Sequence, residues 1–475
     1  MLLIIECDRV AARTVARNLR ANKIWCKIVP NQISKEQVEL FDPSGIIFAG
    51  AETPPSVLPS ASLLELNLPT LVLGVLSIWY IQQLNGGAIT YSNQPTLADV
   101  TFDNSLLYKG FQPSKYMLCG EYNLVLPEVL KAIAFDEKTN AIVAFKHTQS
   151  CAYATTMLVE KHDPYMDEML FEFANGIANC TPWWSEDAFI EKTVAHIKRA
   201  VGEENAMCAM TGGLNSGVAA LLASLALGDN LKCIFVNTGL FRSDEVDLFL
   251  KYYQQHKGLN IKVINAQEQF LHILEGVVSS EDKHREIHNL LKAIVEKEQR
   301  EIPSCSVVIR GTSFKDSMNI GFLNEYSNER HLAPLCDLFK EEIRQVGRKL
   351  GIWDEIVEKQ PLAATALAQR IVGSVTREKL EILKRADDIF ASLVRDNGST
   401  KKLWQFFAIL ADYEQSGSYM VCLRAVQLQD GNYAYPARLP YDLLEKAVEQ
   451  IQEDERVARV VYDITPAKNL VHIEW

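Results

Sequence analysis

The sequence lacks paired cysteines, an excess of basic residues and long apolar runs. Its ten cysteines are scattered singly and no two have CxxC spacing, so the pattern argues against a zinc or dithiol redox site. The formal net charge of −12 argues against a nucleic-acid partner, which would need a basic surface. No apolar run approaches the roughly 20 residues of a membrane span. We therefore expect a cytoplasmic protein with reduced thiols, no metal cluster and no membrane partner.

Alternating apolar and amphipathic stretches predict the fold class. The 475 residues suit two or three domains of ordinary size. Short apolar runs predict buried strands at residues 2–5, 45–48, 70–75 and 141–145. This alternation is typical of an open, largely parallel sheet covered by helices. Residues 1–180 are therefore predicted to form a doubly wound α/β domain.

Two further domains are predicted after a break at Cys180-Thr181-Pro182-Trp183-Trp184. Residues 181–374 again alternate strands with long helices, which predicts a second doubly wound domain. Residues 375–475 are expected to form a small α+β domain. Its predicted helices are 376–396, 401–411 and 440–453, and its predicted strands are 419–427 and 459–463.

A glycine-rich loop, Thr211-Gly212-Gly213-Leu214-Asn215-Ser216, joins a predicted strand to a predicted helix. In this context backbone N–H groups can bind phosphate at the positive end of the helix. The hydroxyl groups of Thr211 and Ser216 would add hydrogen-bond donors. A Gly-Gly turn also serves as a plain tight connection, so the loop alone leaves both interpretations open.

The loop resembles the SGGxDS pyrophosphate loop of ATP pyrophosphatases, and other segments resemble the glutamine-hydrolysing GMP synthase family. The similar segments are Phe235–Arg242, Arg310–Asp316, Leu335–Arg344, Leu423–Val426, Ala437–Asp442 and Val460–Ile464. The resemblance implies a glutaminase domain, an ATP-pyrophosphatase domain and a dimerisation domain. It also implies ATP with Mg²⁺ as cofactor, XMP as acceptor and a homodimer formed through the third domain.

The glutaminase motif departs from that family. The family's GxCxGxQ elbow is here Gly74-Val75-Leu76-Ser77-Ile78-Trp79-Tyr80, and Leu76 has no lone pair with which to attack an amide carbon. The family's FHPE segment is taken to be Lys146-His147-Thr148-Gln149. His147 would then be a remnant of the general base, and Gln149 would replace its orienting carboxylate. Ser77 is one position away from the nucleophile and is not expected to replace it.

The synthetase motifs are altered less decisively. Asn215 and Asn237 replace family aspartates, which removes charges that could organise Mg²⁺. The nucleotide-binding candidates are Thr211, Gly212, Gly213, Asn215, Ser216 and Lys340. The family's HPFPGPGLAIR loop is here residues 360–370, whose Ala-Leu-Ala-Gln favours a helix. The glycine-rich loop after residue 415 and the C-terminal residues 467–475 also depart from the family pattern.

Three functional hypotheses follow. The favoured one is a non-catalytic or strongly impaired homologue, without glutaminase activity, that acts by binding as a regulator, scaffold or partner subunit. The second is an ATP-dependent ligase that uses free ammonia on another acceptor, and the third is a GMP synthase fed by free ammonia. His284 and His288 lie four residues apart, but a solvated helix face explains them better than a metal site. Trp79 and Tyr80 are expected to fill the former glutamine pocket.

Overall fold

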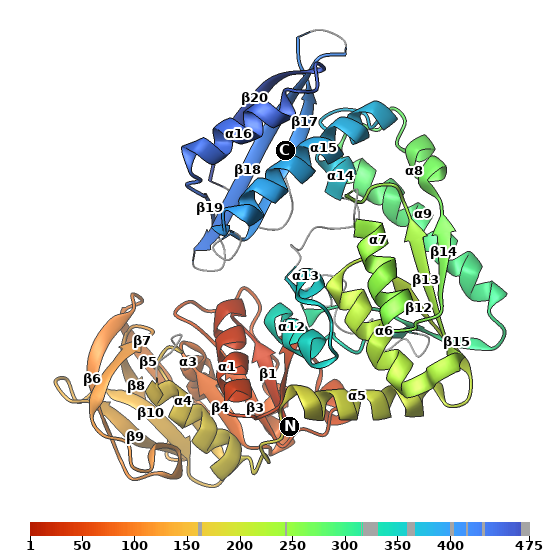
Figure 1. The fold of residues 1–475 in the computed structure, drawn as a ribbon. Coiled ribbons are helices and arrows are strands. Elements are labelled where there is room, and N and C mark those ends of the chain that lie inside the picture. Colours follow the sequence, from red (N-terminus) through yellow and green to blue (C-terminus); the bar gives the residue numbers. More distant parts are fainter. Residues whose placement is uncertain are drawn as a thin grey trace. The chain divides into compact units, whose positions relative to one another are not determined.

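In the computed structural model, the chain divides into two compact units, Met1–Phe189 and Ile190–Trp475 (Figure 1). The structure describes residues 1–159, 164–242, 245–314, 316, 331–358, 366–399, 403–414, 417–429 and 433–466. No helix in these ranges is both long and apolar enough to cross a membrane. Each unit is described separately below.

A nine-stranded sheet organises the first unit, in the order β2-β1-β3-β4-β11-β10-β9-β6-β7. Its strands are β1 (Leu2–Glu6), β2 (Cys26–Pro30), β3 (Gly45–Ala49), β4 (Thr70–Leu73), β6 (Thr96–Phe102), β7 (Ser114–Leu118), β9 (Leu130–Asp136), β10 (Ile142–His147) and β11 (Ala152–Thr155). The pairs from β2 to β11 are parallel and the pairs from β11 to β7 are antiparallel. The predicted strands are confirmed. The predicted parallel pairing holds only for the part of the sheet from β2 to β11.

The remaining elements of the first unit cover or extend this sheet. They are α1 (Arg9–Ala21), α2 (Lys35–Leu40), η1 (Ala61–Leu66), α3 (Leu76–Gln83), η2 (Leu106–Tyr108), α4 (Pro164–Phe171), η3 (Glu172–Ile177) and the two-stranded sheet β5 (Gly87–Ser92) and β8 (Glu121–Val125). Asp8 caps α1 by accepting a hydrogen bond from the Ala11 N–H at 2.8 Å. Helix α5 (Glu186–Val201) continues into the second unit.

A five-stranded parallel sheet begins the second unit, in the order β14-β13-β12-β15-β16. Its strands are β12 (Asn205–Met210), β13 (Leu231–Asn237), β14 (Ile261–Asn265), β15 (Cys305–Ile309) and β16 (His331–Leu332). The accompanying helices are α6 (Leu214–Leu227), η4 (Gly228–Asn230), α7 (Glu245–Leu250), η5 (Lys251–His256), α8 (Gln267–Ile273), α9 (Ser280–Glu301), α12 (Lys340–Lys349), α13 (Asp354–Val357) and α14 (Ala366–Gln369). This is the second predicted parallel α/β fold.

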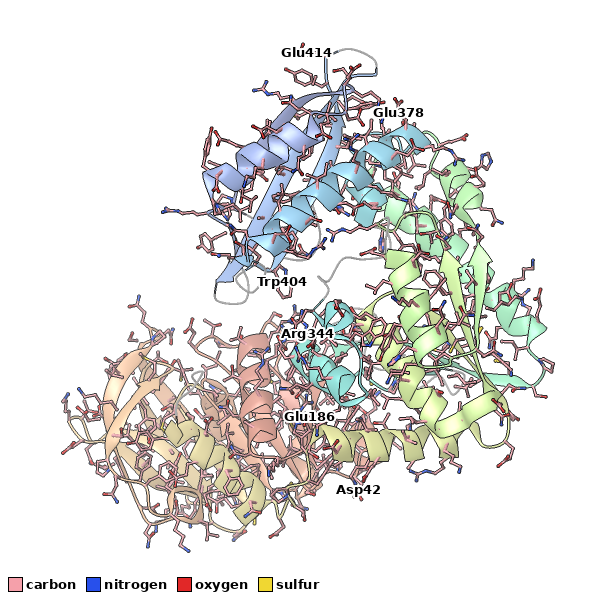
Figure 2. The ribbon with its side chains drawn as sticks, viewed as in Figure 1. Asp42, Glu186, Arg344, Glu378, Trp404 and Glu414 are labelled. Atoms are coloured by element: carbon pink, nitrogen blue, oxygen red, sulfur yellow. The ribbon has the colours of Figure 1, made fainter. Side chains whose placement is uncertain are left out.

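A smaller sheet completes the second unit. Its antiparallel strands are β17 (Gln405–Asp412), β18 (Tyr419–Gln429) and β19 (Tyr433–Pro436), and β20 (Val457–Asp463) is parallel to β18. Its helices are α15 (Arg377–Asp396) and α16 (Tyr441–Ile451). Glu378 of α15, labelled in Figure 2, accepts a hydrogen bond from the Tyr419 hydroxyl of β18 at 3.0 Å. One hydrophobic core extends from Met207 to Val457, so α14 and α15 pack with both sheets.

The predicted helix at residues 401–411 is wrong, because residues 405–412 form β17. Phe406, Ala408 and Leu410 enter the large core, whereas Phe407 and Ile409 form a small cluster on the other face. A strand buried on both faces reads as a continuous apolar run, which periodicity cannot distinguish from a buried helix. The helix predicted from Ala-Leu-Ala-Gln is confirmed as α14.

Gly217, in the first turn of α6, provides a test of this packing. A Cβ there would lie 1.9 Å from the Tyr253 hydroxyl oxygen, and Tyr253 is fully buried. We expect Gly217→Ala to lower the free energy of unfolding by about 1–3 kcal/mol, because an overpacked core must shift, as measured by urea unfolding. Gly213→Ala is the control, since its methyl would meet nothing closer than 3.9 Å. Equal stability of the two variants would contradict the packing described.

Candidate functional site

The position expected to carry a nucleophile in the first unit is filled by an alkyl side chain. Gly74 has a φ of +63°, and α3 begins two residues later at Leu76. Leu76 is 1% exposed, and a Cβ added to Gly50 would lie 2.8 Å from its Cγ. Leu76 therefore packs directly against Gly50.

Ser77 does not replace the missing nucleophile. Its side chain is fully buried, and its hydroxyl donates a hydrogen bond to the Gly74 carbonyl oxygen at 2.8 Å. Since the hydroxyl is committed to the backbone of the turn, it is not available to attack a substrate.

The structure does not bring His147 near Leu76. His147 ends β10, which is antiparallel to β11, and extending the printed register places it level with Ala152. Ala152 pairs in turn with Thr70, at the beginning of β4. Leu76 lies beyond the other end of β4, after Leu73. Thr70 and Leu73 are three residues apart on β4, so at 3.3 Å per residue His147 and Leu76 are separated by at least about 10 Å along the strand direction. Assigning His147 as the base that faces Leu76 is therefore a mistake of alignment.

The hydrogen bonds of His147 also argue against a role as base. Its Nδ1 accepts hydrogen bonds from the backbone N–H groups of Gln149 at 3.2 Å and Ser150 at 3.1 Å. With Nδ1 acting as acceptor, the neutral ring must carry its proton on Nε2. Gln149 is exposed and contributes its backbone to this turn.

The carboxyl end of β11 is the edge from which a base for position 76 would come. Strand β11 is parallel to β4 and adjacent to it, so the two strands end at the same edge. Thr156 and Met157 follow β11, and Met157 is 1% exposed. The Cys119 N–H donates to the Thr156 carbonyl oxygen at 2.8 Å. None of the residues from Thr156 to residue 159 is a histidine, aspartate or glutamate, so the described residues directly after β11 contain no general base.

Trp79 and Tyr80 are core residues of the first unit. The Trp79 ring lies 5.4 Å from that of Phe48, and the Tyr80 ring stacks on Phe145 at 6.3 Å. Burial raises the pKa of Tyr80 to about 12. The prediction that these rings block a glutamine pocket remains a prediction.

In the second unit, the glycine-rich loop has the predicted strand–loop–helix setting. Strand β12 ends at Met210, and α6 begins at Leu214 with Gly213 as its N-cap. Gly212 has a φ of +76°, a conformation that favours glycine. The Ser216 hydroxyl accepts a hydrogen bond from the Thr211 N–H and donates one to the Gly213 carbonyl oxygen, each at 3.1 Å. The loop is therefore held in shape by its own serine.

Neighbouring segments approach this loop closely. A Cβ on Gly311 would lie 2.5 Å from the Ser216 amide nitrogen, so only glycine allows this approach. After β13, the Gly239 N–H donates to Asn237 Oδ1 at 3.1 Å and the Leu240 N–H to the Thr238 hydroxyl at 3.2 Å. The ends of β12, β13 and β15 thus meet at one edge of the sheet, as they do in nucleotide-binding α/β folds.

A cavity of about 1360 Å³ opens at this edge. All the nucleotide-binding candidates, Thr211, Gly212, Gly213, Asn215, Ser216 and Lys340, line it. Its wall contains more basic than acidic residues. The six basic residues are Arg242, Lys292, Arg300, Arg310, Lys340 and Arg370, and the three acidic residues are Glu245, Glu296 and Asp316. A wall with excess positive charge, within a chain of net charge −12, favours an anionic ligand.

Two of these arginines share one buried carboxylate. Arg242 Nε lies 2.6 Å from Asp387 Oδ2 and Arg370 Nη1 lies 2.6 Å from Oδ1, while the Ala408 N–H donates to Oδ1 at 2.7 Å. Burial alone would raise the pKa of Asp387, but the charges of Arg370 and Arg242 outweigh it and hold that pKa below its usual value. Asp387 is fully buried and Arg370 is 1% exposed. Sequence motifs alone did not reveal this cluster.

Arg242 retains unused hydrogen-bonding capacity beside the cavity. Its side chain is 9% exposed, and its Nη2 has no hydrogen-bond partner among the described residues. An unsatisfied guanidinium donor is costly to bury. A ligand oxygen would satisfy it, and the positive charge would favour a phosphate or carboxylate.

The residues present fit a nucleotide better than a protein-held magnesium ion. The loop Thr211–Ser216 contains no carboxylate, and Asn237 uses its side-chain oxygen within its own turn. Within the described ranges, no cluster of three His, Cys, Asp or Glu residues could hold a metal ion. Mg²⁺ would therefore be held mainly by nucleotide phosphates. His284 and His288 stack at 6.4 Å on α9, and only His288 lines the cavity.

Several altered family motifs fall outside the described residues. These are Lys315, residues 360–365, residue 415 and residues 467–475.

Comparison with known proteins agrees with this architecture. Residues 187–406 match the NAD synthase family and residues 392–475 match the GMP synthase C-terminal domain. The GMP synthase [glutamine-hydrolyzing] of Caldanaerobacter subterraneus subsp. tengcongensis is 33% identical over 100% of this chain and 98% of its own length. That of Caldicellulosiruptor saccharolyticus is 34% identical over 100% of this chain and 99% of its own. The chain therefore belongs to the GMP synthase family.

Proposed function

We propose that this chain binds an adenine nucleotide in the cavity of its second unit and releases no ammonia from glutamine. The observation that carries the second part is the packing of Leu76 against Gly50, at the position of the expected nucleophile. Supporting it, the described residues directly after the adjacent strand β11 include no histidine or carboxylate, and His147 lies level with the other end of β4. Without a nucleophile or an aligned base, acyl transfer has no route in this site.

The first part of the proposal is supported by the cavity at the glycine-rich loop. The loop presents backbone N–H groups at the beginning of α6, the positive end of a 14-residue helix. Lys340, the first residue of α12, lines the same cavity, as does Arg242. Asn215 and Asn237 replace family aspartates, and the loss of those two carboxylates weakens any catalytic metal arrangement. We therefore favour binding without turnover, in a regulator or partner subunit.

A second candidate is an ATP-dependent ligase that takes ammonia from solution. The Arg242–Asp387–Arg370 cluster favours it, because Arg242 is held by Asp387 while its Nη2 has no partner among the described residues, which suits a second anionic substrate. AMP release from ATP in the presence of XMP and ammonium chloride would support this candidate. No AMP above the buffer blank, together with nucleotide binding, would support the first.

A nucleophile alone should not restore the glutaminase. We expect Leu76→Cys to release no glutamate from glutamine above a buffer blank, because no aligned base would activate the buried thiol. Glutamate is measured by a coupled dehydrogenase assay. Ser77→Ala is the control and should equal the wild-type protein. Glutamate release by the wild-type protein, or by the single variant Leu76→Cys, would contradict the proposal.

Lys340 provides the test of nucleotide binding. Isothermal titration with ATP·Mg²⁺ should show binding to the wild-type protein and about tenfold weaker binding to Lys340→Gln, since a charge-assisted hydrogen bond contributes about 1.5–3 kcal/mol. Lys297→Gln is the control, because Lys297 is exposed on α9 and does not line the cavity. No heat of binding with the wild-type protein would overturn this part of the proposal.

The family membership also suggests an assembly. We expect two copies to pair through residues 375–475, which gives a mass of about twice 53.4 kDa in light scattering. Deleting those residues is not a suitable control, because α15 and the small sheet belong to the core of the second unit. A monomer mass at micromolar concentration would contradict the pairing.

A further inference from the structure

Lys283 of α9 is a buried amine that the site described above does not use. Its side chain is 1% exposed. Its Nζ donates hydrogen bonds to the carbonyl oxygens of Ile371 at 2.6 Å and Ala368 at 3.3 Å. Across the described part of the chain, no carboxylate forms an ion pair with it. An apolar residue would fill this position at lower cost, so the amine calls for an explanation.

The surroundings of Lys283 disfavour its charge. Burial, together with the positive charge of Lys379 on α15, lowers the pKa of Lys283 to about 8. Lys379 itself forms an ion pair with Asp412 at 2.8 Å. The carboxylate of Asp412 is therefore already engaged by Lys379. The compensation for Lys283 comes from the two carbonyl groups that it binds.

Those two carbonyl groups flank Arg370. Residue 368 lies within α14 and residue 371 follows it, so Lys283 ties α9 to the turn that carries the arginine. On the other side, Arg370 accepts a hydrogen bond at its carbonyl oxygen from the Leu410 N–H of β17 at 2.9 Å. The backbone around Arg370 is therefore held from two directions.

The chain of contacts continues from Arg370 to the cavity. Arg370 binds one oxygen of Asp387, and Arg242 binds the other. Both arginines line the cavity, and Arg242 keeps an unpaired Nη2. A shift of the turn at Arg370 would move Asp387 and so change where Arg242 is held. Packed networks of this kind transmit displacement because their members have few alternative positions.

We infer that Lys283 is a positioning residue for the anionic ligand of the cavity, which it affects by fixing Arg370 and, through Asp387, Arg242. Lys283 itself does not line the cavity, so its effect is indirect. The inference rests on the proposed nucleotide binding. It assigns a function to a buried amine whose two hydrogen bonds hold the backbone on either side of Arg370.

Lys283→Met tests the inference, because methionine has a similar volume but no N–H donor. Affinities for ATP·Mg²⁺ and for XMP are measured by isothermal titration in the wild-type protein, Lys283→Met, Arg242→Gln and the double variant. The informative nucleotide is the one whose affinity Arg242→Gln lowers. For it, we expect Lys283→Met to bind about tenfold more weakly. Lys297→Met, on the exposed face of α9, is the matched control.

The double variant separates positioning from general damage. If Lys283 acts through Arg242, the double variant should bind about as weakly as Arg242→Gln alone, because neighbours in one network are not additive. Additive losses, wild-type affinity in Lys283→Met, or no loss in Arg242→Gln would each overturn the inference while leaving the proposed function intact. Lack of binding by the wild-type protein would overturn both. Lys283→Gln, which keeps N–H donors, replaces the methionine variant if that protein does not fold.

Discussion

The carboxylate of Asp387 holds two arginine side chains at the wall of the cavity in the second unit. It is fully buried and shared by Arg242 and Arg370, each at 2.6 Å. Removing one partner from such a buried group costs about 3–5 kcal/mol, because the remaining charge is left uncompensated. The cluster therefore joins α15 and the loop after β13 into one rigid arrangement. This interaction connects the loop after β13, which lines the cavity, to strand β17 of the small C-terminal sheet.

The two units differ in the kind of side chain that they bury near the family motifs. In the first, Leu76 packs on Gly50 at the position expected to carry a nucleophile, and Met157 is buried just after the neighbouring strand β11. Apolar burial stabilises a fold by about 25 cal/mol per Å², so both side chains contribute to the stability of this unit. In the second, Arg370 and Lys283 are buried. Burying a charged group is costly, and here Asp387 and two backbone carbonyl groups compensate these charges.

Much of this architecture was predictable from the sequence, because apolar periodicity and the glycine loop determine the strands and the phosphate-binding turn. The alignment of His147 failed for a specific reason. Two strands, at residues 142–147 and 152–155, follow each other closely, and only the second is parallel to β4. Sequence alone did not show which strand ends beside Leu76. The helix predicted at 401–411 failed because β17 is buried on both faces.

Long-range charge pairing was equally inaccessible to sequence reasoning. Arg242 and Asp387 are 145 residues apart, and nothing in either local segment identifies the other as its partner. The same applies to Lys283, which looks like part of a solvated, charged helix until its position under α14 is known. A charged residue on an amphipathic helix is usually exposed. When it is instead buried against backbone carbonyl groups, the structure points to a function that composition and periodicity conceal.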